Sequence, residues 1–132
     1  MLLHCERKID AQSVRNLYDH VGWWPQRTLA DINVVLNSGD AAIGVWADGR
    51  LVGFARVVSD GKFRAFIEDV VVHEDFRHRG IASKMSSKLA DELSHIETIT
   101  LFCGAELVPL YQSRGFKGTR QVVMHRKGAQ KG

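Results

Sequence analysis

The chain has 132 residues, of which 45% are hydrophobic and 25% are charged, and its formal net charge is +3 at pH 7. This balance predicts one folded domain with a buried core and excludes a largely disordered chain. No run approaches the roughly 20 apolar residues of a membrane-spanning helix, so we expect no membrane partner. We expect one domain over residues 1–127 and a frayed tail over 128–132.

The cysteines, histidines and basic residues narrow the class further. Cys5 and Cys103 form no C-x-x-C pair and are too few for a disulfide scaffold, so buried thiols in a reducing compartment are predicted. The first residues lack an apolar stretch of signal-peptide length, and we expect a cytoplasmic protein. The six histidines show no metal-ligand spacing, so we expect no metal. The Lys and Arg residues form no dense patch with aromatic residues, so no nucleic acid partner is expected.

Apolar spacing and turn signals predict ten elements. Asp10 and Thr28 are helix caps, the latter with Asp31 in a capping box, and Asp48-Gly49 and Asp60-Gly61 are turns. The expected strands are Leu2–Lys8, Ala41–Ala47, Leu51–Ser59, Phe63–Val72, Thr98–Cys103 and Phe116–Arg126. The expected helices run from Asp10 to Gly22, Thr28 to Gly39, Ile81 to His95 and Leu107 to Arg114. The strand–helix–strand unit over 63–103 should cross over right-handed, with parallel strands, giving an α+β layered domain with a mixed sheet.

The junction between the Val-rich strand and the third helix carries the strongest functional signal. Val72 ends the strand, and Arg77-His78-Arg79-Gly80 leads into the helix that begins at Ile81. A helix N-terminus presents unpaired amides and a partial positive charge. Gly80 and Ala82 leave its backbone approachable, and the basic side chains add charge. The pattern predicts a diphosphate site.

Two segments resemble the GCN5-related N-acetyltransferases (GNAT). Ile67–Ala82 looks like their acetyl-CoA-binding core, in which Q/R-x-x-G-x-G/A follows a Val-rich strand. Tyr111–Phe116 looks like their Y-x-x-x-G-F stretch, at the expected distance downstream. The resemblance covers the chain from about Ala41 to the end. It implies a GNAT-like three-layer fold, with a mixed central sheet and helices on both faces.

The resemblance also implies a co-substrate and its contacts. The pantetheine arm of acetyl-CoA would pair with the backbone of Val70, Val71 and Val72, where the third strand of the meander and the strand ending at Cys103 splay apart. The pyrophosphate would be held by Arg77, His78, Arg79, Gly80, Ile81, Ala82 and Ser83. Tyr111 would lie near the thioester sulfur and protonate the leaving thiolate; core packing of a tyrosine on a short amphipathic helix is the alternative. A homodimer would fit the resemblance.

The attacking amine must lose a proton, because a free alkyl amine with a pKa of about 10.4 is mostly charged at neutral pH. Glu68 and Asp69 are the candidate proton acceptors, since they interrupt an otherwise apolar strand. Adjacent strand residues face opposite sides, so at most one should face the substrate unless a bulge intervenes. A structural carboxylate bound to an arginine is an equal alternative.

The acceptor is less defined. Trp23 and Trp24 lie between the first two helices, where the resemblance suggests a pocket wall; core packing is the alternative. The strand at Ile67 is similar to that of glucosamine-6-phosphate N-acetyltransferases, but Phe102 and Leu107 replace two of their polar residues, which argues against a sugar phosphate. We expect an acetyl-CoA-dependent N-acetyltransferase in which a primary amine of a small molecule attacks the thioester directly. The alternatives are a peptide or protein N-acetyltransferase and a non-catalytic module that binds CoA or nucleic acid.

Overall fold

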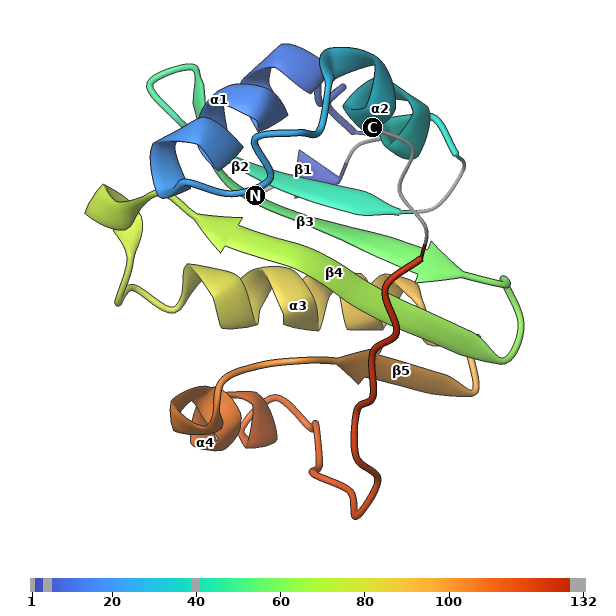
Figure 1. The fold of residues 1–132 in the computed structure, drawn as a ribbon. Coiled ribbons are helices and arrows are strands. Elements are labelled where there is room, and N and C mark those ends of the chain that lie inside the picture. Colours follow the sequence, from blue (N-terminus) through green and yellow to red (C-terminus); the bar gives the residue numbers. More distant parts are fainter. Residues whose placement is uncertain (1, 4–5, 39–40, 129–132) are drawn as a thin grey trace.

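The computed structural model describes residues 2–3, 6–38 and 41–128 of the chain. Within these ranges the strands form one sheet in the order β1-β2-β3-β4-β5 (Figure 1). Neighbouring strands are antiparallel except β4 and β5, which are parallel as the predicted crossover requires. The strands are β1 (Leu2–Leu3), β2 (Ala42–Ala47), β3 (Arg50–Ser59), β4 (Arg64–Val72) and β5 (Thr98–Leu101).

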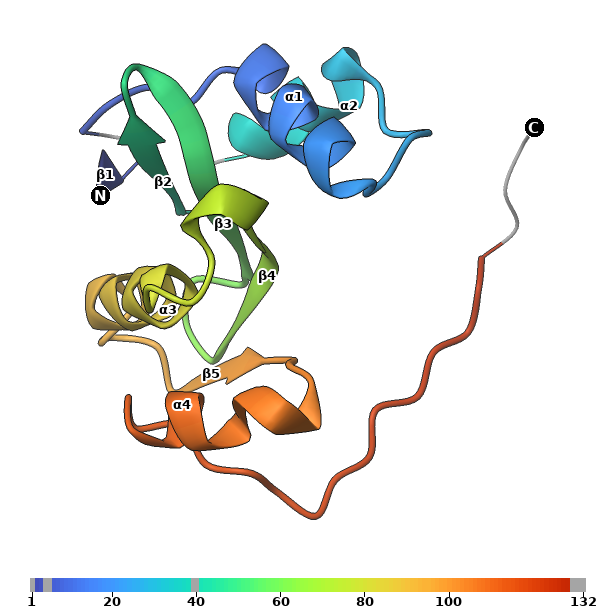
Figure 2. The same cartoon turned by 90° about the vertical axis from the view of Figure 1, so that its left-hand side faces the viewer.

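Helices cover both faces of the sheet, as Figures 1 and 2 show. Two lie together on one face, α3 lies on the other, and α4 follows β5 at the edge of the sheet. The helices are α1 (Ala11–Val21), α2 (Leu29–Leu36), α3 (Ile81–Glu92) and α4 (Val108–Gln112). The predicted α+β class with a mixed sheet is therefore confirmed. No helix in the described ranges is long and apolar enough to cross a bilayer.

Local signals fix where the first two helices begin. Asp10 accepts a hydrogen bond from Ser13 N over 2.9 Å at the start of α1, which ends at Gly22 with φ of 77°. Thr28 and Asp31 form the predicted capping box of α2. These contacts pair backbone groups that a helix end leaves free. The end predicted for α2 falls partly on residue 39, which lies outside the described residues.

Two apolar clusters join the layers. Met85 and Leu89 of α3 pack with one face of the sheet, and Leu17 of α1 packs with Phe54 and Val71 on the other. All five side chains are buried. Burial of one such side chain contributes about 1.5–3 kcal/mol. The two clusters hold β4 from both sides, and β4 carries most of the candidate site.

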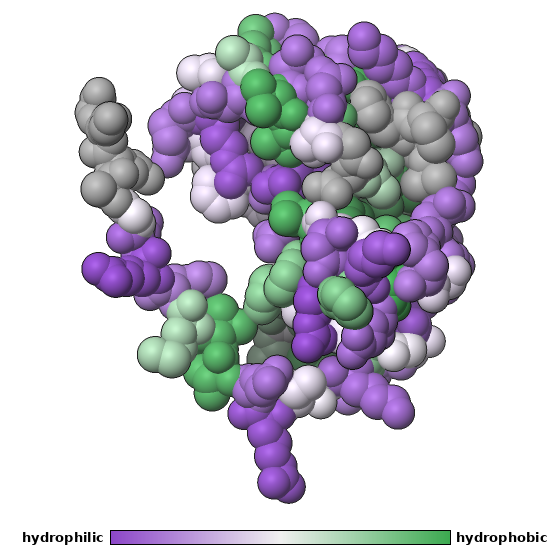
Figure 3. Space-filling view, turned by 90° about the vertical axis from the view of Figure 1, so that its right-hand side faces the viewer, coloured by the Kyte–Doolittle hydropathy of each residue, from purple (hydrophilic) through white to green (hydrophobic). Residues whose placement is uncertain are grey.

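Two strand predictions near the chain ends need correction. The strand predicted over Leu2–Lys8 is described only at Leu2–Leu3, and residues 4–5 lie outside the described part. The strand predicted over Phe116–Arg126 is wrong, because the residues after Phe116 form no strand and stay exposed (Figure 3). Their alternating pattern has no neighbouring strand to pair with, and strand formation depends on that partner.

β5 is shorter than predicted, and this changes the setting of Cys103. The strand ends at Leu101, and the chain turns through Gly104 into a 3₁₀ helix at Ala105–Leu107. Cys103 is a free, exposed thiol, so the predicted buried strand thiol is wrong. Partial burial, followed by the charge of Glu106, raises its pKa and weakens it as a nucleophile.

Candidate active site

The turn after β4 presents an open helix N-terminus. A 3₁₀ helix at Glu74–Phe76 follows β4, and α3 begins directly after Gly80. Gly80 has φ of 75°, a conformation that favours glycine, and no described side chain caps this helix. A Cβ added at Gly80 would meet only Lys84 Cε, at 3.9 Å. Ser83 is buried and donates to the Gly80 carbonyl over 3.2 Å. The first amides of α3 are therefore stiffly held and accessible to an anion.

The basic side chains of this turn are held in defined places. The exposed residues are Arg77, His78 and Arg79, whereas Ile81 and Ala82 are half-buried. Arg77 Nε donates to the carbonyl of Val72 over 3.1 Å, which ties the turn to the end of β4. The guanidinium carbon of Arg79 lies 5.1 Å from the ring centre of Phe76. The structure thus brings the predicted diphosphate residues together at one end of α3.

β5 ends before β4 reaches this turn. Their parallel ladder consists of four residue pairs and ends at Ile67 and Leu101. On its other side, β4 stays paired with β3 as far as Val72. The β5-facing edge of β4 beyond Ile67 therefore has no strand partner among the described residues. The backbone of Val70–Val72 lies on this stretch, beyond the last residue of β5.

A β-bulge turns two consecutive carboxylates to one face of β4. The register between β3 and β4 shifts beyond the pair formed by Arg56 and Glu68, and Asp69 has φ of 53°. Cross-strand partners share a face of the sheet, and the Asp69 side chain contacts this same Arg56. Glu68 and Asp69 therefore both lie on the face that α1 and α2 cover. Regular alternation would have separated them.

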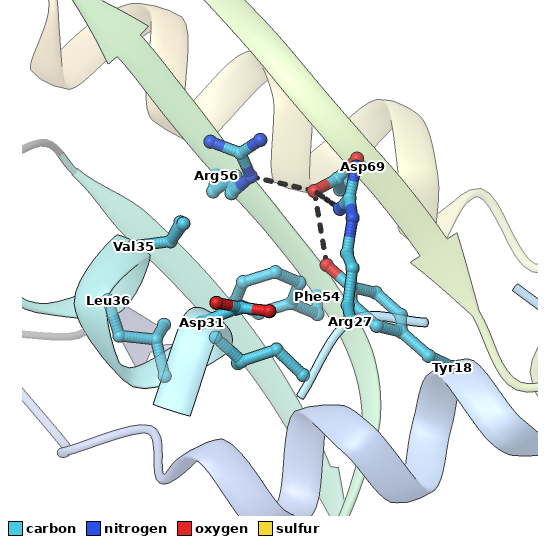
Figure 4. Close-up of a pocket in the computed structure, with 9 residues that line it drawn as sticks. Tyr18, Arg27, Asp31, Val35, Leu36, Phe54, Arg56 and Asp69 are labelled. Carbon is cyan, nitrogen blue, oxygen red and sulfur yellow. Dashed lines mark hydrogen bonds and ion pairs between the residues drawn. The ribbon is translucent and has the colours of Figure 1, made fainter. Parts of the chain in front are cut away.

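Asp69 is the centre of a buried charge cluster (Figure 4). Its Oδ2 accepts hydrogen bonds from Arg56 Nε at 2.7 Å, Arg27 Nη1 at 2.9 Å and the Tyr18 hydroxyl at 3.1 Å. Only 5% of the Asp69 side chain is exposed. Burial, followed by the negative charge of Asp69, raises the pKa of Tyr18, so its phenol stays a hydrogen-bond donor. This is the geometry of an arginine-bound structural carboxylate.

A cavity of about 290 Å³ adjoins the cluster. It is lined by Tyr18, Arg27, Asp31, Ile32, Val35, Leu36, Phe54, Arg56 and Asp69. Figure 4 shows Arg27 and Arg56 pointing toward Asp69 of β4, whereas Val35 and Leu36 lie on the α2 side together with Asp31. Glu68, on the same face of β4, is half-buried and makes no hydrogen bond or ion pair with any described residue. The cavity combines an apolar wall with a charged end beside a free carboxylate.

The two predicted tryptophans lie behind this cavity. Arg15 donates to the carbonyl oxygens of Trp23 and Trp24 over 2.8 and 2.6 Å, which holds their loop against α1. The Trp23 ring centre lies 6.4 Å from that of Tyr18. The guanidinium carbon of Arg27 lies 4.1 Å from the ring centre of Trp24. Neither tryptophan lines the cavity. Each instead contacts a residue that does: Trp23 contacts Tyr18, and Trp24 contacts Arg27.

Tyr111, on α4, is 5% exposed, and its ring meets Phe116 edge-on at 5.9 Å. The Ser86 hydroxyl of α3 is buried, and no described residue meets hydrogen-bond geometry with it. It lies near enough to Tyr111 to affect the phenol's ionisation. Burial raises the pKa of Tyr111, and Ser86 opposes that rise. The result is a protonated phenol, the state that a proton donor requires.

Sequence reasoning missed Tyr18 and Ser86. Tyr18 falls on the apolar stripe of α1, and its partner Asp69 is 51 positions away, so only the fold reveals the contact. Arg27 and Arg56 both line the cavity. No group of three or more His, Cys, Asp or Glu side chains in the described ranges could hold a metal ion.

Comparisons with known proteins point to the family that the sequence motifs resemble. Residues 8–116 match the acetyltransferase (GNAT) family. A protein of Pyropia yezoensis named uncharacterized N-acetyltransferase ycf52 is 35% identical over 120 residues, covering 86% of this chain and 68% of that protein. Across this and two further ycf52 proteins, the chain spans 62% to 68% of their length.

Solved structures share the fold. Glucosamine-6-phosphate N-acetyltransferase from Arabidopsis thaliana superposes with a TM-score of 0.75 at 18% identity, covering 96% of this chain and 97% of that one. A GNAT-family acetyltransferase from Streptococcus pneumoniae gives 0.70 at 21% identity, covering 90% and 93%. The chain belongs to the acetyltransferase (GNAT) family, and the predicted family and enzyme class, an N-acetyltransferase, are confirmed.

Proposed function

We propose that this chain transfers an acetyl group from acetyl-CoA to a primary amine of a small molecule, by direct attack of the amine on the thioester. The observation that carries this proposal is the free edge of β4. It leads from Glu68 and Asp69 to the open N-terminus of α3 at Gly80. A CoA thioester laid along this edge would have its diphosphate at the helix and its acetyl group beside the carboxylates.

The donor side follows from backbone chemistry. The β5-facing edge of β4 at Val70–Val72 would offer backbone groups to the pantetheine amides, as a strand offers them to an added strand. The Val72 carbonyl also accepts a hydrogen bond from Arg77 Nε. The first amides of α3, with Arg77 and Arg79 beside them, would bind the pyrophosphate. Acetyl-CoA supplies the activated acyl group, and these residues fix its position relative to the acceptor.

Glu68 is the proposed proton acceptor, directly or through one water. Asp69 Oδ2 already accepts three hydrogen bonds and faces two guanidinium groups, so it is committed to holding Arg27 and Arg56. Glu68 shares that face and has no competing described partner. Asp69 would then be a positioning residue that fixes the charged end of the cavity.

Tyr111 is the proposed donor to the leaving thiolate. Burial keeps its phenol protonated at neutral pH, and a proton delivered to sulfur makes departure easier. After the amine attacks the carbonyl carbon, the carbon–sulfur bond breaks and the thiolate takes the phenol proton. The proton released by the amine goes to Glu68. Exchange with solvent then removes this proton from Glu68 and returns a proton to the Tyr111 phenolate, so both residues are restored after one turnover.

The cavity volume favours a small acceptor. About 290 Å³ is at the lower end of the range for small-molecule pockets, roughly 300–1,000 Å³. The apolar wall from α2 would contact the body of the acceptor, while its amine would approach β4. A peptide acceptor would need a longer groove leading to the same carboxylates.

The deciding experiment measures free thiol released from acetyl-CoA in the presence of small primary amines and, separately, of lysine-containing peptides. Thermal stabilisation by acetyl-CoA is recorded in parallel, because a ligand that binds the folded state raises the melting temperature. Turnover with small amines supports the proposal. Turnover with peptides alone would replace it with peptide acetylation. Stabilisation without turnover across both panels would favour a non-catalytic CoA-binding module.

A further inference from the structure

A second cavity lies on the α1 side of the sheet, apart from the candidate active site. It measures about 440 Å³, within the range of roughly 300–1,000 Å³ for small-molecule pockets. Its walls come from α1, from the hairpin that joins β2 to β3, and from the turn after β4. Figure 1 shows this hairpin beside α1, at the end of the sheet where β4 stops. The second cavity shares no lining residue with the cavity beside Asp69.

His73, which lines this cavity, is a hydrogen-bond donor without a described partner. Its side chain is 7% exposed, and its Nδ1 accepts a hydrogen bond from the Asp75 amide over 3.1 Å. The proton of the neutral ring is therefore on Nε2, and no described residue accepts it. The His20 ring stacks on the His73 ring with centres 3.7 Å apart and holds its plane. A nearly buried donor is normally paired, and a ligand in the cavity would supply the acceptor.

Charges of both signs line the same cavity. Asp48 and Arg50 flank Gly49 in the β2–β3 hairpin, and neither side chain makes a hydrogen bond or ion pair with a described residue. A guanidinium group binds a carboxylate through two parallel hydrogen bonds, and a carboxylate binds an ammonium group. Leu17 and Leu51, both buried, add apolar surface. The cavity therefore matches a ligand with one carboxylate, one ammonium group and a partly apolar body.

The cavity is also connected to the turn that carries the proposed diphosphate site. The His73 carbonyl accepts a hydrogen bond from Phe76 N over 2.9 Å, and the two rings meet edge-on with centres 5.9 Å apart. Arg79 in turn packs on the Phe76 ring. His73 thus contacts the cavity on one side and the start of the turn on the other. A ligand bound to His73 would hold this turn in one arrangement, which favours any second ligand that needs it.

We propose that this second cavity binds a free α-amino acid, and that the bound amino acid raises the affinity of the chain for CoA. The ligand carboxylate would pair with Arg50 and accept the proton of His73 Nε2 in a hydrogen bond. The ligand ammonium group would pair with Asp48. Binding of the amino acid rests on the cavity alone, whereas its effect on CoA also rests on the proposed diphosphate site.

The first test measures the melting temperature with each common L-amino acid in turn, in the absence of acetyl-CoA. At least one amino acid is expected to raise it. Arg50→Gln and Asp48→Asn should each weaken that binding at least about tenfold, because each removes a charge-assisted contact. Arg64→Gln is the matched control, since Arg64 is an exposed arginine at the start of β4, at the opposite end of the sheet. No stabilisation by any amino acid would overturn the proposal.

Two derivatives of the stabilising amino acid test the charge match. Its N-acetyl form lacks the ammonium group and its methyl ester lacks the carboxylate, so neither should bind. Equal binding of either derivative would overturn the assignment of a zwitterion. An amino acid that acts instead as the acetyl acceptor would bind beside Glu68, and Arg50→Gln would then leave its binding unchanged. That result would also overturn the second site.

Calorimetric titration of CoA, with and without the saturating amino acid, tests the coupling. CoA replaces acetyl-CoA so that no acetyl transfer can occur during the titration. The amino acid should tighten CoA binding at least about fivefold, and CoA should tighten amino acid binding by the same factor, because coupling between two sites is reciprocal. The Arg50→Gln variant should lose both effects. Equal CoA affinities with and without the bound amino acid would overturn the regulatory role.

Discussion

Arg56 Nε on β3 and Asp69 Oδ2 at the β-bulge of β4 lie 2.7 Å apart. The bulge brings Asp69 to the face of the sheet that α1 and α2 cover. There Asp69 binds Tyr18 of α1, Arg27 of the loop between α1 and α2, and Arg56 of β3. The contact therefore fixes the cavity and the strand edge relative to each other. Asp69 is held by these three contacts, whereas Glu68 has no described partner. Substitutions of the two adjacent carboxylates should therefore have different effects.

Asp69→Asn should lower the free energy of unfolding by about 1–3 kcal/mol, measured by urea denaturation. The change removes the charge that Arg27 and Arg56 share, and partial exposure of both arginines limits the loss. Asp19→Asn breaks a surface pair with Arg15 and is the control, with an expected loss below about 0.5 kcal/mol. Equal losses would show that the Asp69 cluster does not stabilise the fold.

Glu68→Gln should lower kcat roughly a hundredfold while leaving the affinity for acetyl-CoA unchanged, because it removes a proton acceptor and preserves the side-chain shape. The exposed residue Glu106, changed to Gln, provides the control and should keep the parent rate. If the Glu68→Gln variant keeps the parent kcat, proton transfer must use another group.

Gly80→Ala should lose stability and cofactor affinity together. Gly80 and Gly49 have φ of 75° and 77°, and a Cβ would fit sterically at both sites. Alanine at either site should therefore cost about 1–2 kcal/mol of folding free energy from backbone strain. Only Gly80→Ala should weaken acetyl-CoA binding, roughly tenfold or about 1.4 kcal/mol. Calorimetric titration showing equal affinities would exclude the α3 N-terminus as the diphosphate site.

Tyr111→Phe should lower kcat roughly a hundredfold, with little change in KM, since it removes the phenol proton and keeps the ring that packs on Phe116. The measurement is thiol release under saturating acetyl-CoA and amine. A rise in KM with unchanged kcat would make Tyr111 a binding residue instead.

Alkaline pH should destabilise the protein through its two tyrosines. Tyr18 and Tyr111 both have pKa values raised above the ordinary 10.0 by burial. The unfolded chain therefore releases these protons at a lower pH than the folded chain. The stabilisation is complete below pH 10 and is lost as the pH rises past it. Phenolate absorbance should appear at a higher pH in native protein than in protein unfolded by urea. Identical titration curves would contradict the burial of both phenols.

Local signals predicted much of the fold. Asp10, the Thr28 capping box and the Asp48-Gly49 turn act within a few residues, so each could be identified from its neighbours. The bulge at Asp69 arises from register between two strands, and nothing in the Ile67–Val72 run marks it. The site followed the same division: the α3 turn was visible in sequence, whereas the Tyr18–Asp69 contact required the fold.

The pattern after Phe116 shows the limit of periodicity. Alternating and β-branched residues indicate a strand only if another strand is available, and the chain alone does not state where that partner lies. Cys103 was misplaced for a related reason, since the length of β5 depends on its neighbour β4.

The ladder between β4 and β5, which has only four residue pairs, also affects how the proton donor is held. It attaches β5, and the α4 helix that follows β5 and carries Tyr111, to the rest of the sheet. A CoA molecule bound along the free edge of β4 would contact both β4 and the segment formed by β5 and α4. That segment would therefore be held most firmly when the reactants are present. Assembly of the proton donor would then be linked to the arrival of the donor substrate.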